Sequence, residues 1–129
     1  MGYLEINKIN VKLPIFHGSE RSVLQNGIGH MKGSSFLVES QSSHVVLAGH
    51  TGLPSAKLLT DLNKMEIGDK FEISVLKYKF VYEVDQILVV EPNNTENLEI
   101  EEGKQFATLI VCTPYGVNSH RLLVRGKLI

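Results

Sequence analysis

Residues 70–90 read KFEISVLKYKFVYEVDQILVV, and this stretch decides the fold class. Phe71 and Ile73 alternate with polar side chains, which is typical of a strand with one face in water. The same alternation resumes at Phe80 and Tyr82 after a short polar break. Two alternating segments so close together predict a β-hairpin.

The second strand of this hairpin runs on into Ile87–Val90, where both faces are apolar. A straight strand of the combined length would be unusual, since strands are most often about 5–6 residues long. We therefore expect a bend or bulge near Asp85 and Gln86 that changes which face is buried. Pro92 and the asparagines after it should end the strand.

The rest of the chain also favours short strands. A helix is expected after Pro54, with Leu62 and Met65 on its apolar face and Gly68 at its end. A shorter helix is expected at Glu20–Gln25. Many short strands with one or two small helices predict an all-β barrel or sandwich. The further expected strands are Leu13–Phe16, Ser35–Val38, Val45–Ala48, Thr108–Cys112 and Arg121–Val124.

Length and composition are those of a single globular domain, expected here over residues 1–129. Of the 129 residues, 43% are hydrophobic and 21% are charged, which is ordinary for such a domain. The net charge of −1 provides no broad basic face for nucleic acid or anionic lipid. The aliphatic runs are far shorter than the ~20 residues that cross a bilayer, and no signal peptide is expected in this chain.

Neither a metal nor a cofactor is expected. The only cysteine is Cys112, so no intramolecular disulfide can form. The chain has five histidines, and none has the spacing typical of zinc ligands. His17, His30 and His44 are expected at the surface or at strand ends.

His50 is the first candidate for chemistry. It follows an apolar strand and lies between Gly49 and Gly52. Glycines on both sides let the backbone turn sharply and leave the imidazole unshielded. Such a histidine is either a general acid/base or an ordinary loop residue, and its own surroundings leave both interpretations open.

Cys112 ends a buried strand just before a turn that contains Pro114 and Gly116. It is either a nucleophile or a small buried core residue. Arg121 opens a strand that should pair antiparallel with the strand ending at Cys112, so the two are expected to be neighbours. Arg121 is either a functional cation beside the thiol or an ordinary surface charge. Because a guanidinium does not deprotonate, it could act there only through charge and hydrogen bonding. Arg125 is expected to be a surface charge.

Three stretches then carry a resemblance to a known family: LPIFHGSE at 13–20, LAGHTG at 47–52 and CTPYGVNSHRLLVRG at 112–126. They resemble the sortase family, and specifically its class C, the pilin-polymerising sortases. Residues 27–33 and 56–62 are similar to that class too, so the likeness covers nearly the whole chain. It implies a closed eight-stranded β-barrel that acts as a cysteine transpeptidase.

The resemblance also implies roles and partners. Cys112 would be the nucleophile, His50 the general acid/base, and Arg121 the group that stabilises the oxyanion and the substrate. The substrates would be pilins or other surface proteins with a Leu-Pro-x-Thr-Gly-like sorting signal, cut after Thr through a thioester, and a pilin lysine amine would accept the acyl group. No cofactor and no nucleic acid are implied. The implied location is the extracellular face of the membrane of a Gram-positive bacterium, with this chain as a soluble fragment.

The chain departs from the class pattern in three respects. Val111 stands where sortases usually carry Thr, so a hydroxyl near the thiol is expected to be missing. Thr51 stands where the class often has Arg. No Asp precedes a Pro, so the lid of the class is expected to be absent from this chain. The membrane anchors of the class are also expected to be absent, which would make the chain an excised catalytic core.

Three other functions remain open. A related sortase would attach single proteins to peptidoglycan, and the acceptor is not written in the sequence. A cysteine hydrolase would release the acyl group to water. A non-catalytic β-domain would bind peptides and keep Cys112 buried.

Overall fold

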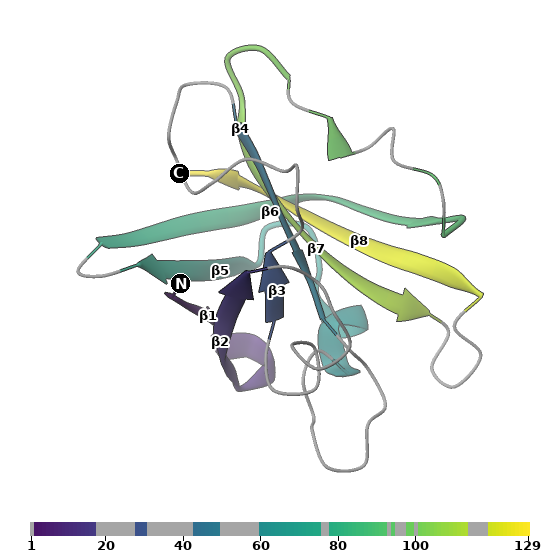
Figure 1. The fold of residues 1–129 in the computed structure, drawn as a ribbon, viewed down its shortest axis with the longest axis horizontal. Coiled ribbons are helices and arrows are strands. Elements are labelled where there is room, and N and C mark those ends of the chain that lie inside the picture. Colours follow the sequence, from purple (N-terminus) through teal and green to yellow (C-terminus); the bar gives the residue numbers. More distant parts are fainter. Residues whose placement is uncertain are drawn as a thin grey trace.

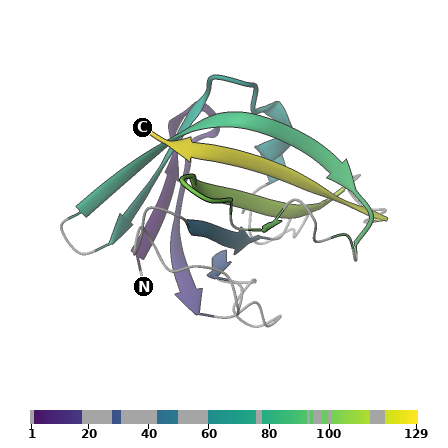
Figure 2. The ribbon, with the colours of Figure 1, turned by 90° about the horizontal axis from the view of Figure 1, so that it is seen from above.

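A closed β-barrel of eight strands accounts for most of the described chain (Figure 1, Figure 2). The order of strands around it is β1-β2-β3-β4-β7-β8-β6-β5, and β1 pairs with β5 to close it. The closed all-β barrel expected from the sequence is therefore confirmed. The computed structural model describes residues 2–17, 28–30, 43–49, 60–75, 78–92, 94, 98–99, 101–113 and 119–129.

The elements are short, apart from the long strand β6. Among the described residues no helix is long and apolar enough to cross a membrane. The two 3-10 helices are η1 (Asn7–Ile9) and η2 (Thr60–Lys64). The strands are β1 (Gly2–Ile6), β2 (Val11–His17), β3 (Ile28–His30), β4 (Ser43–Ala48), β5 (Lys70–Val75), β6 (Tyr78–Val90), β7 (Gln105–Thr113) and β8 (His120–Leu128).

The sequence pattern missed β1 and β3, because each offers too few alternations to stand out. In β1 only Leu4 and Ile6 point inward, and both are fully buried. β3 has three residues, and its centre is Gly29. Pairing with neighbours makes them strands: β1 pairs antiparallel with β2 and β5, and β3 pairs parallel with β2 and antiparallel with β4.

The barrel interior is filled by aliphatic and aromatic side chains from every strand, which is the main source of stability in such a fold. On β4, β7 and β8 the alternate side chains face the other way, and several of those are buried as well. These three strands are therefore covered on both faces. The interior includes Leu4, Ile15, Ile28, Leu47, Ile73, Tyr82, Leu109 and Val124, and the second buried face includes His44, Val46, Phe106, Thr108 and Leu123.

A bulge in β6 confirms the expected change of face. The pairing between β6 and β8 shifts register between Val84 and Gln86. Before the shift Tyr82 and Val84 are buried in the core, and after it Ile87 packs against the core. An even-numbered inward face thus becomes an odd-numbered one, because a bulge adds one residue to one strand only.

The expected helix that closes at Gly68 is partly wrong. Its described part is the 3-10 helix η2, which ends at Lys64, although Leu62 and Met65 are buried as predicted. The Met65 N–H donates to the Leu62 carbonyl oxygen, a three-residue step that tightens the chain and does not continue an α-helix. Gly68 instead lies in a turn, with a φ of 95° that other residues rarely adopt.

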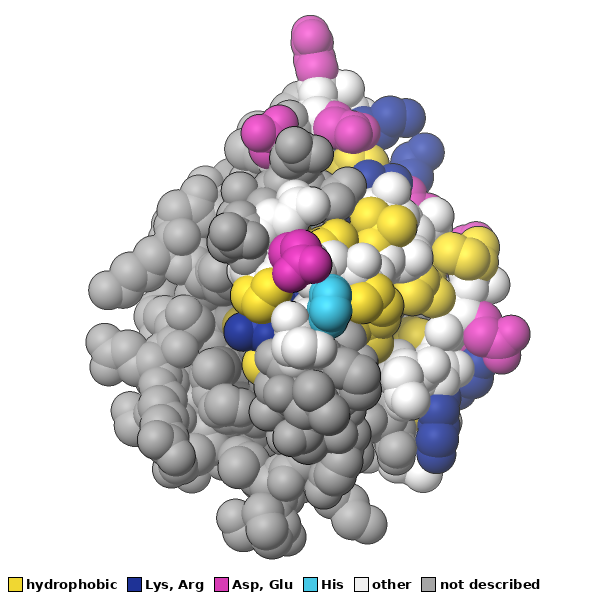
Figure 3. Space-filling view, turned by 90° about the vertical axis from the view of Figure 1, so that its right-hand side faces the viewer, with side chains coloured by type: hydrophobic (Ala, Val, Ile, Leu, Met, Phe, Trp, Pro, Cys, Tyr) yellow, Lys and Arg dark blue, Asp and Glu magenta, His cyan; other side chains and the backbone are white. Residues whose placement is uncertain are grey.

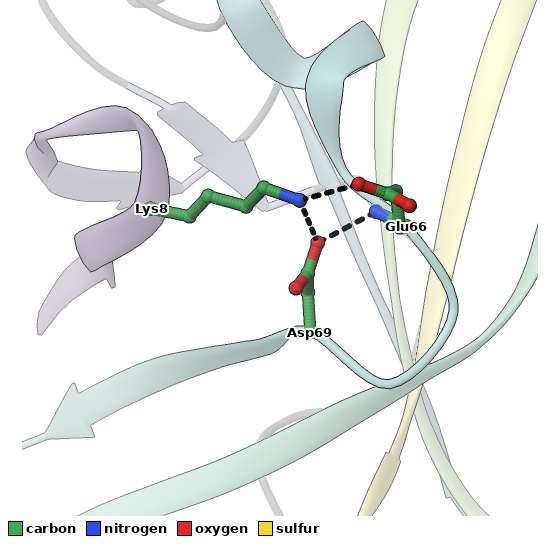
Figure 4. A network of polar contacts seen from close by, with 3 residues as sticks. All are labelled: Lys8, Glu66 and Asp69. Atoms are coloured by element: carbon green, nitrogen blue, oxygen red, sulfur yellow. Dashed lines mark hydrogen bonds and ion pairs between the residues drawn. The ribbon is translucent and has the colours of Figure 1, made fainter.

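A polar network explains why the chain turns after η2. The Asp69 carboxylate accepts a hydrogen bond from the Glu66 N–H at 2.7 Å and one from Lys8 Nζ at 2.7 Å, as Figure 4 shows. Lys8 Nζ also lies 3.1 Å from Glu66 Oε1. The hydrogen bond from Lys8 is the main cause that holds the pKa of Asp69 below its usual value. The network ties η1 to the turn before β5.

Several expected elements lie outside the described residues. These are the strand at Ser35–Val38, the helix at Glu20–Gln25 and the first part of the helix after Pro54. The strands expected around 13–16, 45–48, 108–112 and 121–124 are all confirmed, each extended by a few residues.

Tyr82 gives the first testable prediction. Its side chain is fully buried, and its hydroxyl has no hydrogen-bond partner within the described residues. Replacing Tyr82 with Phe should therefore raise the free energy of unfolding at neutral pH by about 1 kcal/mol, because an unpaired buried hydroxyl is removed. Urea unfolding measures this difference, with exposed Tyr3→Phe as the matched control.

The same substitution should change the response to alkaline pH. Burial raises the pKa of Tyr82 to about 12 from its ordinary value of 10.0. Between these values the unfolded chain loses the proton and the folded chain keeps it, so stability falls as pH rises, by about 2–3 kcal/mol in all. The Phe variant should lack this part of the decline. An identical decline in the variant would contradict the buried, neutral phenol.

Candidate active site

Ends of four neighbouring strands lie at one edge of the barrel, which we call the rim. The order β4-β7-β8-β6 makes these strands adjacent. β4 ends at Ala48, β6 ends at Val90, β7 ends at Thr113 and β8 begins at His120. In Figure 1 the end of β7 and the start of β8 lie together at the right-hand side. Residues far apart in the sequence thus become neighbours.

Cys112 and Arg121 are partners across two strands of the rim. β7 and β8 are antiparallel, and their register pairs Cys112 with Arg121. Paired residues have Cα atoms about 4.5–5.5 Å apart and side chains on the same face of the sheet. The expected juxtaposition of thiol and guanidinium at one rim is therefore confirmed at the level of strand register.

β4 leads toward the rim at which Cys112 and Arg121 are paired. It runs parallel to β7, and its last residue, Ala48, is paired with Ile110. The N–H of Gly49 then donates to the Ile110 carbonyl oxygen at 2.9 Å, so the chain follows β7 for one residue beyond the strand. His50 is the next residue and lies outside the described residues, as do residues 114–118.

The residue before the cysteine faces away from it. Val111 is 3% exposed and belongs to the barrel core, whereas Cys112 is partly buried. Successive residues of a strand point to opposite faces. A Thr at position 111 would place its hydroxyl in the core and not beside the thiol. The departure from the family pattern therefore concerns core packing, contrary to the expectation of a hydroxyl missing near Cys112.

Arg121 is held by the backbone of the rim. Its Nη1 donates to the carbonyl oxygen of His120 at 3.0 Å. The His120 ring lies 2.9 Å from Ser119 Oγ through Nδ1 and 3.4 Å from Glu91 Oε1 through Nε2. Figure 3 shows a histidine next to an acidic side chain on this side of the molecule, with hydrophobic side chains beside them. On the β6 side, Val90 is the register partner of Arg121.

His44, expected at the surface or at a strand end, is the second residue of β4 and is buried there. It is 1% exposed, with Nδ1 2.9 Å from the Glu99 carbonyl oxygen and Nε2 2.6 Å from Thr108 Oγ1. Burial is the main cause that lowers the pKa of His44 below its ordinary value of 6.5. The apolar run Val45–Ala48 was the available signal, because a strand apolar on both faces is usually covered on both.

Arg125 is not a simple surface charge either. Its side chain is 17% exposed, and Nε and Nη2 donate to the two carboxylate oxygens of Asp85 at 2.9 and 3.0 Å. Its guanidinium carbon lies 3.9 Å from the centre of the Phe106 ring. The bulge at Asp85 and the register of β8 create this contact. Local sequence predicts the bulge, but not that Arg125 of β8 lies beside it.

The described residues contain no group of three or more His, Cys, Asp or Glu side chains that could hold a metal ion. At the rim the described residues supply a thiol from Cys112 and, from Arg121, a cation that stays charged. A guanidinium beside a thiol can donate hydrogen bonds to a group bound there.

Comparison with known proteins identifies the family of this chain. A family model described as the Sortase domain matches residues 4–129. The chain belongs to the sortase family. The family expected from the sequence is thereby confirmed, and the closed eight-stranded barrel agrees with it.

Solved sortase structures are similar over the whole chain. The chain is 52% identical to sortase C1 from Streptococcus suis, with a TM-score of 0.97, covering 99% of this chain and 72% of that one. It is 50% identical to sortase C1 from Streptococcus agalactiae, with a TM-score of 0.98, covering 100% of this chain and 67% of that one. The likeness to class C expected from the sequence thus extends to the three-dimensional fold.

Curated relatives are more distant. Sortase D of Bacillus subtilis (strain 168) is 29% identical over 98% of this chain and 62% of that protein. Sortase A of Bacillus anthracis is 27% identical over 100% of this chain and 60% of that protein. The chain thus spans about three fifths of the length of these two relatives.

Proposed function

We propose that this chain is the catalytic domain of a class C sortase, a cysteine transpeptidase that builds pili. The observation that carries the proposal is the register pairing of Cys112 with Arg121 at the rim. It is supported by membership of the sortase family and by about half-identical sequences among sortase C1 structures. Residues 1–129 act as one domain in this proposal, because β1 near the start pairs with β5 to complete the barrel.

The first half of the proposed reaction forms a thioester. The thiolate of Cys112 attacks the Thr carbonyl carbon of a Leu-Pro-x-Thr-Gly-like signal, and the carbonyl electrons move onto oxygen. Arg121 stabilises this oxyanion, because its guanidinium keeps its charge and donates hydrogen bonds. As the C–N bond breaks, His50 gives its proton to the leaving Gly amine.

The second half transfers the acyl group to an amine. The side-chain amine of a pilin lysine attacks the thioester carbon, and His50 takes up the proton that the amine loses. The C–S bond breaks and Cys112 leaves as a thiolate, so an isopeptide bond remains. The proposed partners are therefore pilins or other surface proteins that carry the signal, and the proposed location is the outer face of the membrane of a Gram-positive bacterium.

Activation of the thiol is a requirement of this scheme. An ordinary cysteine with a pKa of ~8.5 is only about 3% thiolate at pH 7. A protonated imidazole near the sulfur raises that fraction and then serves as the acid. We assign this role to His50, which follows Gly49 in the sequence, and the Gly49 N–H donates to the Ile110 carbonyl oxygen on β7.

Mass spectrometry of the intact protein and of its products tests the proposal. The chain is incubated with a Leu-Pro-x-Thr-Gly peptide and a lysine-bearing acceptor peptide, and a Cys112→Ala variant is the control. We expect a thioester adduct on the wild type that moves to the lysine, and no adduct on the variant.

Other outcomes identify the alternatives. An adduct released only to water would favour a cysteine hydrolase, and an adduct released only to a peptidoglycan-type amine would favour a wall-anchoring sortase. No adduct, together with no alkylation of Cys112 in the folded state, would favour a peptide-binding β-domain.

A further inference from the structure

His44 lies where three separate parts of the chain meet. It belongs to β4, its Nε2 is 2.6 Å from Thr108 Oγ1 on β7, and its Nδ1 is 2.9 Å from the Glu99 carbonyl oxygen. Glu99 belongs to the connection between β6 and β7, residues 91–104. Figure 1 shows the end of this connection arching over the start of β4 before it enters β7. A single imidazole therefore fastens the connection to two strands.

The partners decide which nitrogen carries the proton. A carbonyl oxygen can only accept a hydrogen bond, so Nδ1 of His44 must carry a proton and donate to Glu99. In the neutral ring Nε2 is then an acceptor, and the Thr108 hydroxyl donates to it. Both ring nitrogens are satisfied in this tautomer, and the ring needs no charge to hold the connection.

The surroundings disfavour a second proton on the ring. Burial is the largest effect that lowers the pKa of His44, and Arg125 on β8 lowers it further. The hydrogen bond to the Glu99 carbonyl, Glu101 in the connection and Asp85 on β6 act in the opposite direction, and the net shift is downward. A protonated ring would also force the Thr108 hydroxyl to reverse its hydrogen bond.

The same three parts of the chain lead to the rim. β7 runs from Thr108 to Cys112 in four residues. The connection begins directly after Val90, which is the register partner of Arg121. Within the described residues, β7 is therefore the element that joins the contact between His44 and Thr108 to the rim at Cys112.

We propose that His44 is a positioning residue whose neutral ring fastens the β6–β7 connection to the barrel, and whose protonation loosens it. The connection would then be held near pH 7 and released in acid. The structural part stands on the contacts of His44 alone, and the kinetic part rests on the proposed transpeptidase function.

Nuclear magnetic resonance of the whole chain tests the structural part. The imidazole of His44 and the amides of residues 98–104 are followed from about pH 8 to about pH 4, because the pKa of His44 lies below its ordinary value of 6.5. We expect the Nδ1-protonated neutral tautomer at pH 7. The 98–104 amides should shift with the same midpoint as the ring, and the Lys104 N–H, which donates to the Glu101 carbonyl oxygen at 3.0 Å, should lose protection from hydrogen exchange. If these amides do not change as His44 titrates, the wild-type protein alone overturns the proposal.

Two variants separate the hydrogen bond from the charge. His44→Asn keeps a donor for the Glu99 carbonyl but cannot titrate, so its 98–104 amides should show no acid transition and its Lys104 N–H should stay protected down to about pH 4. His44→Leu keeps apolar bulk without the donor, so the Lys104 N–H should be unprotected at every pH. An acid transition retained in the Asn variant, or wild-type protection in the Leu variant, would contradict the proposal.

Steady-state kinetics test the positioning role. We expect His44→Leu to raise KM for the sorting peptide by about tenfold with little change in kcat, and His44→Asn to restore KM. Equal loss of kcat and of folded protein would indicate a merely structural role. If the chain has no acyl-transfer activity at all, the resonance experiment still decides the structural part, so the two failures are distinguishable.

Discussion

Replacing Arg121 with lysine should lower kcat/KM for transpeptidation by about a hundredfold to a thousandfold, mainly through kcat. Lysine keeps the positive charge at the register partner of Cys112 but lacks the planar, two-pronged donor set of the guanidinium. It also lacks the nitrogen that now donates to the His120 carbonyl at 3.0 Å, so its ammonium would not be fixed at the rim. Steady-state kinetics with the sorting peptide, at a pH near 7.5, would measure the loss.

Arg125→Lys is the matched control for this experiment. Arg125 lies on the same strand and the same face, four residues further on, and it is paired with Asp85. Losing the two hydrogen bonds to Asp85 and the contact with Phe106 should lower the free energy of unfolding by about 1 kcal/mol and leave kcat/KM close to wild type. Equal kinetic losses in both variants, or an Arg121→Lys enzyme within about threefold of wild type, would remove Arg121 from the proposed mechanism.

Replacing Gly126 with alanine should destabilise the barrel by about 2–3 kcal/mol, because the interior has no room for a methyl group. A Cβ at this position would lie 2.7 Å from Phe71 Cε1 and 2.8 Å from Tyr82 Cβ. The two rings stack with centroids 5.5 Å apart, and both side chains are buried. Tyr82 Cβ moves only with its backbone, so relief would require β6 and β8 to shift apart.

Gly103→Ala separates crowding from backbone strain. Gly103 has a φ of 75°, and nothing lies within 4 Å of a Cβ added there. Its substitution should cost only about 1 kcal/mol, from the left-handed backbone alone. Urea unfolding of both variants gives the comparison. A Gly126→Ala protein as stable as the Gly103→Ala protein would mean that the core relaxes more easily than close packing allows.

Local sequence was sufficient for the strands with strong alternation and for the bulge. Residues 70–90 contain enough apolar and polar alternation to predict β5 and β6 and the change of face near Asp85. The motifs around His50 and Cys112 were sufficient for the family, because they are specific as a combination. The same motifs predicted that Cys112 and Arg121 lie at one rim. The register of β7 and β8 pairs these two residues.

Tertiary structure decided what depends on partners distant in sequence. β1 and β3 are strands because their neighbours complete their hydrogen bonds, not because their few residues alternate strongly. His44 is buried because the connection from β6 covers that face of β4, and Arg125 is paired because the bulge presents Asp85 to it. The short-range pattern of the sequence determined the strands with strong alternation and the family. Long-range packing determined the environment of each charged group, because the burial and pairing of a side chain depend on which segments meet.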